Sequence, residues 1–435
     1  MNDKNLIYII IILLLFILIN IYNIYINILL YINIIISILL IIYYNKRFKN
    51  NINLIYGYIY FLIMIFYMIG GNINYYIINN VYSNFNINLI KINIYWILGI
   101  IAFTETYLYM KNINKNKIYN IKYYSFSWIY IFLIITIFGT ILLYRDIGFI
   151  PIIKNTRIYS VSSPLFIRLW SFAPLASTLS ISYYSISKKR FYLFLTILLI
   201  FISSILNQRM MFILSILTCG IAYIINKRRS KILFIILAII IIIFSSIFVL
   251  NRDYKYNKTN EIIFGGSNLN NIQRSLIYPF FIDWVQLGIL LDSNYTEYAY
   301  GGTLLNIPIS FIPANILSLF GVDKGKIRSY NSAIIFANYQ KSQSSVGLRT
   351  GIMGEGYINF GLLGFLIMIL IGLFVATLRL PRINQNNIDI IGYIDIILYC
   401  LTIYALIGQI DAISSLIIYY WLIKIALIFI ASIKI

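Results

Sequence analysis

The sequence predicts an all-α polytopic membrane protein with about 12 transmembrane helices, and two observations lead to that prediction. The chain of 435 residues is 61% hydrophobic and only 11% charged, which is far more apolar than a soluble domain needs to be. It also contains long continuous apolar runs, and the run at 232–250 is long enough to cross a bilayer of roughly 30 Å as a helix. Backbone groups in lipid must be hydrogen-bonded within their own span, so we expect helices. The alternating strands of a membrane barrel would not give such runs.

The apolar runs define the expected helices and domains. The first two follow one another without a small-residue cleavage site, so they predict a retained helical pair and not a signal peptide. We expect helices 1–9 within 1–250, a long extracytoplasmic loop with short surface helices at 251–355, and helices 10–12 within 356–435. If the stretch 276–291 enters the membrane as a re-entrant piece, the number of spans changes to eleven or thirteen. The twelve runs lie at roughly 6–22, 24–44, 53–70, 92–110, 123–143, 163–186, 191–206, 210–226, 232–250, 356–378, 388–408 and 412–432.

The charges of the connections predict the orientation of the chain. The connection that follows each even-numbered helix up to the tenth is basic, and the positive-inside rule places such connections in the cytoplasm. Both termini are then cytoplasmic and the loop 251–355 is extracytoplasmic. The basic residues concerned are Lys46, Arg47 and Lys49; Lys111, Lys115, Lys117 and Lys122; Lys188, Lys189 and Arg190; Lys227, Arg228, Arg229 and Lys231; and Arg379 and Arg382.

Composition narrows the classes of partner. The net charge is +21, but the basic residues lie in short connections and not on a soluble face, so we expect no nucleic-acid partner. The chain has no histidine, which removes the usual general base and the commonest metal ligand. Cys219 and Cys400 fall inside predicted helices and are interpreted as small apolar residues, not as a disulfide or metal site.

The long outer loop is expected to carry function, because a loop of this length is seldom idle in a compact protein. It contains seven of the thirteen acidic residues of the chain. Its own apolar stretches predict short helices on the outer surface, with Trp284 and its aromatic neighbours near the lipid headgroups.

Arginines gather in the segments predicted to face outward, where the positive-inside rule disfavours them. Arg209 lies in the turn between two helices, Arg168 lies just inside the outer end of a span, and Arg157 and Arg349 lie in outer connections. The guanidinium group is a planar, permanently charged fork that suits phosphate oxygens. The pattern therefore indicates a lipid-linked phosphate or pyrophosphate as ligand. The alternative is that each arginine snorkels to a headgroup or pairs with an outer acid.

Glu355 lies between Gly354 and Gly356 as the tenth span begins, and it has two interpretations. The glycines would allow another backbone or a ligand to approach closely. A carboxylate at this place can stabilise the start of a helix through its dipole. It can also act as a general base, a role that a histidine would otherwise fill.

Three further charged residues are predicted inside spans: Glu105, Asp395 and Lys424. Intramembrane carboxylates relay protons in some transporters. The structural alternative, which we favour, is a buried pair or a position near the end of a span.

Three segments resemble bacterial oligosaccharide repeat-unit polymerases of the Wzy type. The stretch GLRTGIMGEGYINFGLLGF, which contains Arg349 and Glu355, resembles the segment that enters a late transmembrane helix in those proteins. RDIGFIPIIKNTRI is similar to their outer segment after the fifth span, and NQRM to their short arginine-bearing turn. The layout, with a long outer loop before the last helices, is similar over nearly the whole chain.

The resemblance implies a function and a set of roles. Such polymerases join repeat units carried on undecaprenyl pyrophosphate into O-antigen, capsule or exopolysaccharide at the outer face of the cytoplasmic membrane. They are GT-C-like, all-helical glycosyltransferases that need no metal or other cofactor, and a chain-length regulator protein is a possible partner. Carried onto this sequence, the resemblance makes Glu355 and Arg349 the catalytic residues. It makes Arg209, Arg157 and Arg168 the pyrophosphate ligands, and Trp284 and Tyr357 the glycan-binding aromatics.

Three other functions remain in competition. A lipid-linked oligosaccharide flippase would also have about twelve helices, but short loops and two similar halves. An ion-coupled transporter would use Glu105 and Asp395 and would show paired repeats, which are not evident here. An O-antigen-ligase-like glycosyltransferase would differ mainly in its acceptor, and related ligases use an outer-loop histidine that this chain lacks.

Overall fold

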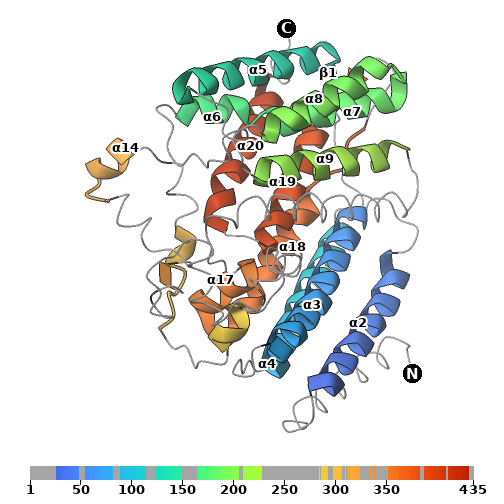
Figure 1. Ribbon diagram of the computed structural model, residues 1–435, viewed down its shortest axis with the longest axis vertical. Coiled ribbons are helices and arrows are strands. Elements are labelled where there is room, and N and C mark those ends of the chain that lie inside the picture. Colours follow the sequence, from blue (N-terminus) through green and yellow to red (C-terminus); the bar gives the residue numbers. More distant parts are fainter. Residues whose placement is uncertain are drawn as a thin grey trace. The chain divides into compact units, whose positions relative to one another are not determined.

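The computed structural model confirms an all-α membrane protein and shows two compact units (Figure 1). Unit 1 comprises Met1–Lys117, Glu261–Thr377 and Thr402–Ile418, and unit 2 comprises Ile118–Asn260, Leu378–Leu401 and Tyr419–Ile435. The residues that the structure describes are 26–48, 54–81, 89–113, 124–148, 164–204, 209–227, 284, 286–291, 297–305, 309, 312, 314–323, 334–335, 338, 351–382, 387–407 and 410–430.

Within the described residues, five helical runs are long and apolar enough to cross a membrane: Ile55–Ile73, Leu89–Ile113, Ser127–Ile147, Leu165–Ser187 and Gly351–Thr377. Shorter apolar helices follow at Arg190–Ser204, Met210–Asn226, Ile390–Leu406 and Ser414–Ile430. The predicted spans 6–22 and 232–250 lie outside the described residues. Large apolar side chains such as Ile134, Phe138 and Ile141 are exposed along one helix face, as expected where a helix faces lipid.

The first part of unit 1 is a row of three helices, α2 (Ile26–Phe48), α3 (Ile55–Val81) and α4 (Leu89–Ile113), which lie side by side (Figure 1). The third span is predicted to end near residue 70, and the candidate span of the structure ends at Ile73, although the helix α3 itself continues to Val81. Asn72 lies near the end of this span, and its side chain is buried and hydrogen-bonded to Asn93 (2.8 Å) and Asn33 (3.4 Å) on the neighbouring helices. A polar residue satisfied in this way does not end a membrane helix.

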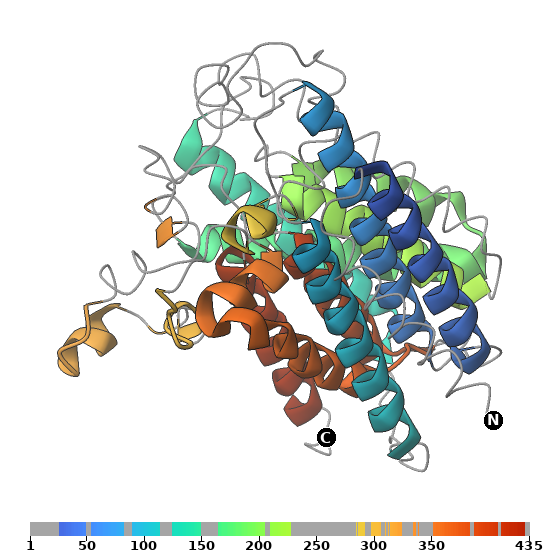
Figure 2. The same ribbon diagram turned by 90° about the horizontal axis from the view of Figure 1, so that it is seen from below.

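The second part of unit 1 is a broken helical run. It consists of α17 (Gly351–Phe360), the 3-10 helix η4 (Gly361–Leu366) and α18 (Ile367–Thr377), which packs against α4 (Figure 2). The contact between α18 and α4 is close at Gly372, where an added Cβ would lie 2.8 Å from the carbonyl oxygen of Phe103. Small residues allow helix backbones in membranes to approach in this way.

The run turns sharply between α17 and η4, so the expectation of one continuous helix at 356–378 is corrected. Gly361 has φ +60°, in the left-handed region that favours glycine. A Cβ added to Gly356 would overlap the carbonyl group of Gly364, although residues eight apart in a straight helix are separated by about 12 Å. The backbone of α17 therefore lies directly against η4. This confirms that Gly356 permits the close approach of another backbone.

Unit 2 contains the helices α5 (Ser127–Ile147), α6 (Pro164–Trp170), α7 (Ala173–Ser187), α8 (Arg190–Ser204) and α9 (Arg209–Lys227). The predicted span 163–186 is divided by a turn at Ser171 and Phe172, after which α7 starts with Pro174 near its N-terminus, where proline is favoured. Helices α8 and α9 both pack against α7 (Figure 1). Thr178 and Thr218, both buried, join α7 to α9 through a hydrogen bond of 2.8 Å.

The last two helices, α19 (Ile390–Ile407) and α20 (Ile410–Ile430), are assigned in part to each unit. Before them, the two-residue strand β2 (Asn387–Ile388) pairs antiparallel with β1 (Tyr124–Ser125), with Tyr124 opposite Ile388. This bridge is a small addition to the predicted all-α fold. It joins the residues that precede α5 and α19.

Candidate functional site

Only one of the four arginines predicted to bind pyrophosphate has a described side chain. Arg157 and Arg349 lie outside the described residues, and Arg209 is the first residue of α9 with no description of its side chain. Arg168 is described, on the short helix α6. The roles of all four residues therefore stay predictions.

Arg168 is held against α20. Its guanidinium carbon lies 5.5 Å from the centre of the Tyr419 ring, and the Tyr419 hydroxyl donates a hydrogen bond of 3.0 Å to the Arg168 carbonyl oxygen. Stacking of this kind covers the face of the guanidinium and not its N–H edges, through which arginine binds phosphate oxygens. The arrangement is therefore compatible with anion binding, and it fixes where the charge lies.

Glu355 lies in a buried polar cluster on α17. It is 1% exposed and accepts a hydrogen bond from the hydroxyl of Thr303, through its Oε1 atom. The side-chain amide of Asn359 donates to the Thr303 hydroxyl oxygen (2.6 Å) and to the backbone carbonyl of Glu355 (2.8 Å). Thr303 and Asn359 are both 0% exposed. We call Glu355, Thr303 and Asn359 the Glu355 cluster.

A segment far away in the sequence brings Thr303 to this place. The backbone N–H groups of Ala299 and Tyr300 donate to the carbonyl oxygens of Ile358 and Asn359, at 2.9 and 3.0 Å. The last carbonyls of a helix have no partner within the helix, so residues 297–305, which we call the capping segment, satisfy the end of α17. The capping segment then enters the 3-10 helix η3 (Thr303–Leu305), which carries Thr303 over Glu355.

The position of Glu355 in its helix bears on its two interpretations. It is the fifth residue of α17, which begins at Gly351 and not near 356. The effect of a helix dipole falls off within the first turn, so stabilisation of the helix start is a poor explanation for this carboxylate. Its burial under the capping segment makes it a group held in a defined geometry.

The two aromatics predicted to bind glycan are packed inside unit 1. Tyr357 is 4% exposed and makes edge-on contacts with the rings of Tyr95 and Tyr298, with centroids 6.0 and 6.2 Å apart. Trp284 is fully buried, with its ring against Gly71 of α3. Neither ring presents an exposed face in this structure, so contact with a sugar would require neighbouring segments to move.

Sequence reasoning missed Thr303 and Asn359. Asn359 had a detectable signal, because it follows Glu355 by four residues and therefore lies on the same face of the helix. Thr303 had none, since nothing in the sequence indicates which of the many hydroxyl residues of the outer loop meets Glu355.

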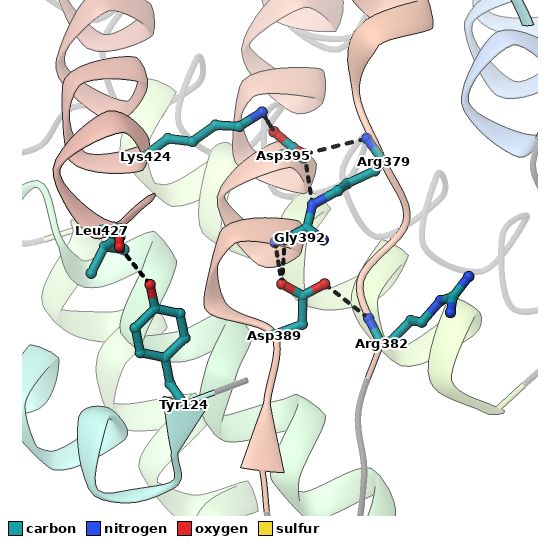
Figure 3. Close-up of polar contacts among 8 residues, drawn as sticks. All are labelled: Tyr124, Arg379, Arg382, Asp389, Gly392, Asp395, Lys424 and Leu427. Carbon is teal, nitrogen blue, oxygen red and sulfur yellow. Dashed lines mark hydrogen bonds and ion pairs between the residues drawn. The ribbon is translucent and has the colours of Figure 1, made fainter. Parts of the chain in front are cut away.

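A second group of charges lies in unit 2, and Figure 3 shows its contacts. Lys424 is 2.6 Å from one oxygen of Asp395, and Arg379 is 2.6 Å from an oxygen of Asp389 and 3.8 Å from the other oxygen of Asp395. We call these four residues the charge network. It contains two cations and two anions, so its formal charge is zero.

Asp389 also lies directly before α19. Its Oδ1 atom accepts a hydrogen bond of 3.0 Å from the backbone N–H of Gly392, and its Oδ2 atom accepts one of 3.4 Å from that of Arg382 (Figure 3). An aspartate that precedes a helix and bonds the third N–H is a typical N-cap. Asp389 thus links the connection after α18 to the start of α19.

The carboxylates considered for a proton relay are both in ion pairs. Asp395 pairs with Lys424, which is the buried pair that the structural interpretation expects. Glu105 on α4 pairs with Arg47 of α2 and accepts a hydrogen bond of 2.9 Å from the hydroxyl of Tyr44. These contacts favour a structural role over proton transport.

Comparisons with known proteins give one match. A family model described as O-antigen polysaccharide polymerase Wzy matches residues 5–434, nearly the whole chain. No curated protein and no solved structure matches it.

Proposed function

The chain belongs to the family of O-antigen polysaccharide polymerases called Wzy, and we propose that it polymerises undecaprenyl-pyrophosphate-linked oligosaccharide repeat units. The reaction takes place at the outer face of the bacterial cytoplasmic membrane and yields O-antigen, capsule or exopolysaccharide. A chain-length regulator protein is a further proposed partner.

The proposed topology has twelve helices in a GT-C-like arrangement. Residues 1–250 supply helices 1–9, the loop 251–355 is extracytoplasmic, and 356–435 supply helices 10–12, with both termini in the cytoplasm. The basic connections after the even-numbered helices support this orientation. No metal or cofactor takes part in the proposed reaction.

The Glu355 cluster is the observation that carries the proposed mechanism. The acceptor sugar hydroxyl attacks the anomeric carbon of the growing glycan, the bond from that carbon to the pyrophosphate oxygen breaks, and undecaprenyl pyrophosphate leaves. Glu355 takes the proton of the attacking hydroxyl. A buried carboxylate in a fixed hydrogen-bonded position suits that role, because a general base must be held within reach of the proton it removes.

Arginines stabilise the leaving group in this proposal. Negative charge develops on the pyrophosphate as its bond to the sugar breaks, and fixed cationic donors lower the energy of that state. Arg209 is the first candidate, followed by Arg157, Arg168 and Arg349. The contact of Arg168 with Tyr419 supports a fixed position for one of these groups.

Access to Glu355 requires a movement. Because the carboxylate is 1% exposed beneath the capping segment, the acceptor hydroxyl reaches it only when residues 297–305 shift. The proposed reaction cycle therefore includes displacement of the capping segment on substrate binding. Such a closing segment also excludes water, which would otherwise hydrolyse the glycan from its carrier.

The proposed function is tested by measuring the chain length of the polysaccharide made by a strain from which the gene is deleted. The strain is complemented with wild type, Glu355→Gln, Arg209→Ala or Arg349→Ala, with Glu297→Gln as the control because Glu297 is an exposed carboxylate of the same segment. The deletion should leave single repeat units on the surface, and wild type and the control should restore long chains. At equal protein level, Glu355→Gln should lower polymerisation by a factor of about 10² to 10⁴, the usual contribution of a general base.

Two other outcomes would point elsewhere. Lipid-linked units trapped on the cytoplasmic side of the deletion strain would identify a flippase. Long chains that remain on the lipid carrier and fail to reach their final acceptor would identify a ligase.

A further inference from the structure

The hydrogen bonds of the Glu355 cluster run in one direction. Asn359 donates to Thr303, and Thr303 donates to the carboxylate of Glu355. All three side chains are at least nine-tenths buried, so solvent water does not compete for these hydrogen bonds. The orientation of each donor is fixed by a second hydrogen bond within the cluster.

The amide of Asn359 has only one workable orientation. Its nitrogen lies 2.8 Å from the backbone carbonyl oxygen of Glu355, and a carbonyl oxygen can only accept. If the amide were turned over, its own oxygen would face that carbonyl and repel it. The nitrogen must therefore point toward Glu355 O, and the same nitrogen donates to the Thr303 hydroxyl at 2.6 Å.

The hydrogen bond from Asn359 fixes the direction of the Thr303 hydroxyl proton. A hydroxyl has one proton to donate, and the oxygen of Thr303 already accepts from Asn359. The proton of Thr303 is then available for Glu355, whose Oε1 atom is its neighbour. Hydrogen bonds donated to a carboxylate favour its charged form, which is the form that accepts a proton.

We infer that Thr303 and Asn359 are positioning residues that hold Glu355 as a proton acceptor in one orientation. The inference rests on the proposed function, because it specifies how the general base of that reaction is prepared. Thr303 comes from the capping segment, which shifts to admit the substrate and then closes again, so that Thr303 donates to Glu355 in the closed state, where the proton is transferred. The same segment thus covers the carboxylate and orients it.

An unpaired atom supports a functional reason for this cluster. The side-chain oxygen of Asn359 is buried and has no hydrogen-bond partner among the residues that the structure describes. A buried acceptor without a partner is unfavourable, and an apolar side chain would avoid that cost. A hydroxyl or N–H group of an acceptor sugar beside Glu355 would satisfy it. A contact that only joined the capping segment to α17 would leave the oxygen unexplained.

The test uses full-length protein in lipid nanodiscs and lipid-linked single repeat units extracted from the polymerase deletion strain. Thr303→Val removes the hydroxyl, and Thr303→Ser keeps it. Thr104→Val is the matched control, because Thr104 is buried in α4 and its hydroxyl donates to the Ile100 carbonyl in its own helix. The measured quantities are kcat, KM and the dependence of kcat on pH, together with the thermal transition of each variant.

The inference predicts a specific pattern. Thr303→Val should lower kcat by about tenfold to a hundredfold, the effect of losing a hydrogen bond to a charged group, while KM changes by less than about threefold. Without the donor, the carboxylate is protonated more easily, so the acidic limb of the pH profile should move to higher pH. Thr303→Ser should restore both values, and Thr104→Val should match wild type.

The outcomes distinguish a failure of this inference from a failure of the proposed function on which it rests. If Glu355→Gln is inactive but Thr303→Val has the kcat and the pH profile of wild type, the positioning role is wrong and the proposed base stands. If wild type makes no polymer from these units, or Glu355→Gln makes it normally, the proposed mechanism itself fails. If Thr303→Val does not fold, Thr303→Ala removes the same hydroxyl with a smaller side chain and gives the same two outcomes.

Discussion

At the scale of single residues, the buried carboxylates of this protein lie in two different environments. Asp389 and Asp395 belong to a network of zero formal charge with Arg379 and Lys424, and their oxygens also bond backbone N–H groups. In such a place the partners supply opposite charge and hydrogen bonds in place of the lost water. Glu355 instead lies beneath the capping segment, next to hydroxyl and amide donors. Charge in the first case stabilises the helix ends, and in the second it is proposed to act on substrate.

The charge network gives a stability prediction. Asp395→Leu should destabilise the protein by about 3 kcal/mol, because it leaves Lys424 without its buried anion. The double variant Asp395→Leu with Lys424→Met should recover most of that loss, since both charges are then absent. Unfolding of the detergent-solubilised variants measures the two values. A double variant as unstable as the single one would show that the pair does more than neutralise charge.

At the scale of helical elements, the break in the run 351–377 builds the candidate site. Gly361 turns the chain, Gly356 and Gly364 let the two parts touch, and the free end of α17 is capped by residues 297–305. A continuous helix would have satisfied its own carbonyls and offered no place for the capping segment. The break is therefore what brings Thr303 to Glu355.

The close contact of α17 with η4 can be tested by adding one methyl group. Gly356→Ala places a Cβ against the backbone of Gly364, which side-chain rearrangement cannot relieve, so it should cost at least about 1–3 kcal/mol and abolish polymerisation. Leu362→Ala is the control in the same run, because Leu362 is 64% exposed, and a change at such a position is usually worth within about 0.5 kcal/mol. A Gly356→Ala protein as stable and active as wild type would contradict the described bend.

The helical class followed from sequence, as did five candidate spans and several shorter apolar helices among the described residues, because lipid demands continuous apolar runs and satisfied backbone groups. The third span agrees with its prediction to within a few residues, but the helix α3 extends beyond it, and the sequence does not show that Asn72 is paired on neighbouring helices. The turn at Gly361 was hidden inside an apolar run for a similar reason: a glycine can continue a helix or reverse it. The partner of Glu355 is a contact between distant segments, and no local pattern encodes it.

At the scale of the whole molecule, the proposed orientation predicts a labelling pattern. Leu319→Cys, at a position 82% exposed on α14 (Ala314–Leu319), should react with a membrane-impermeant maleimide in intact cells. Asn45→Cys, at an exposed position near the end of α2, should react only after the membrane is opened. The native Cys219 and Cys400 are buried free thiols and should add little background. Labelling of Asn45→Cys in intact cells would contradict the proposed orientation.

The chemistry of the reaction gives the most direct test of the central claim. Purified protein is incubated with lipid-linked single repeat units, and the glycosidic bonds formed and the undecaprenyl pyrophosphate released are counted in the same sample. The account predicts longer glycans with one carrier released for each new bond, and loss of both with Glu355→Gln. Release of carrier without new bonds, or no reaction from a folded wild-type protein, would contradict it.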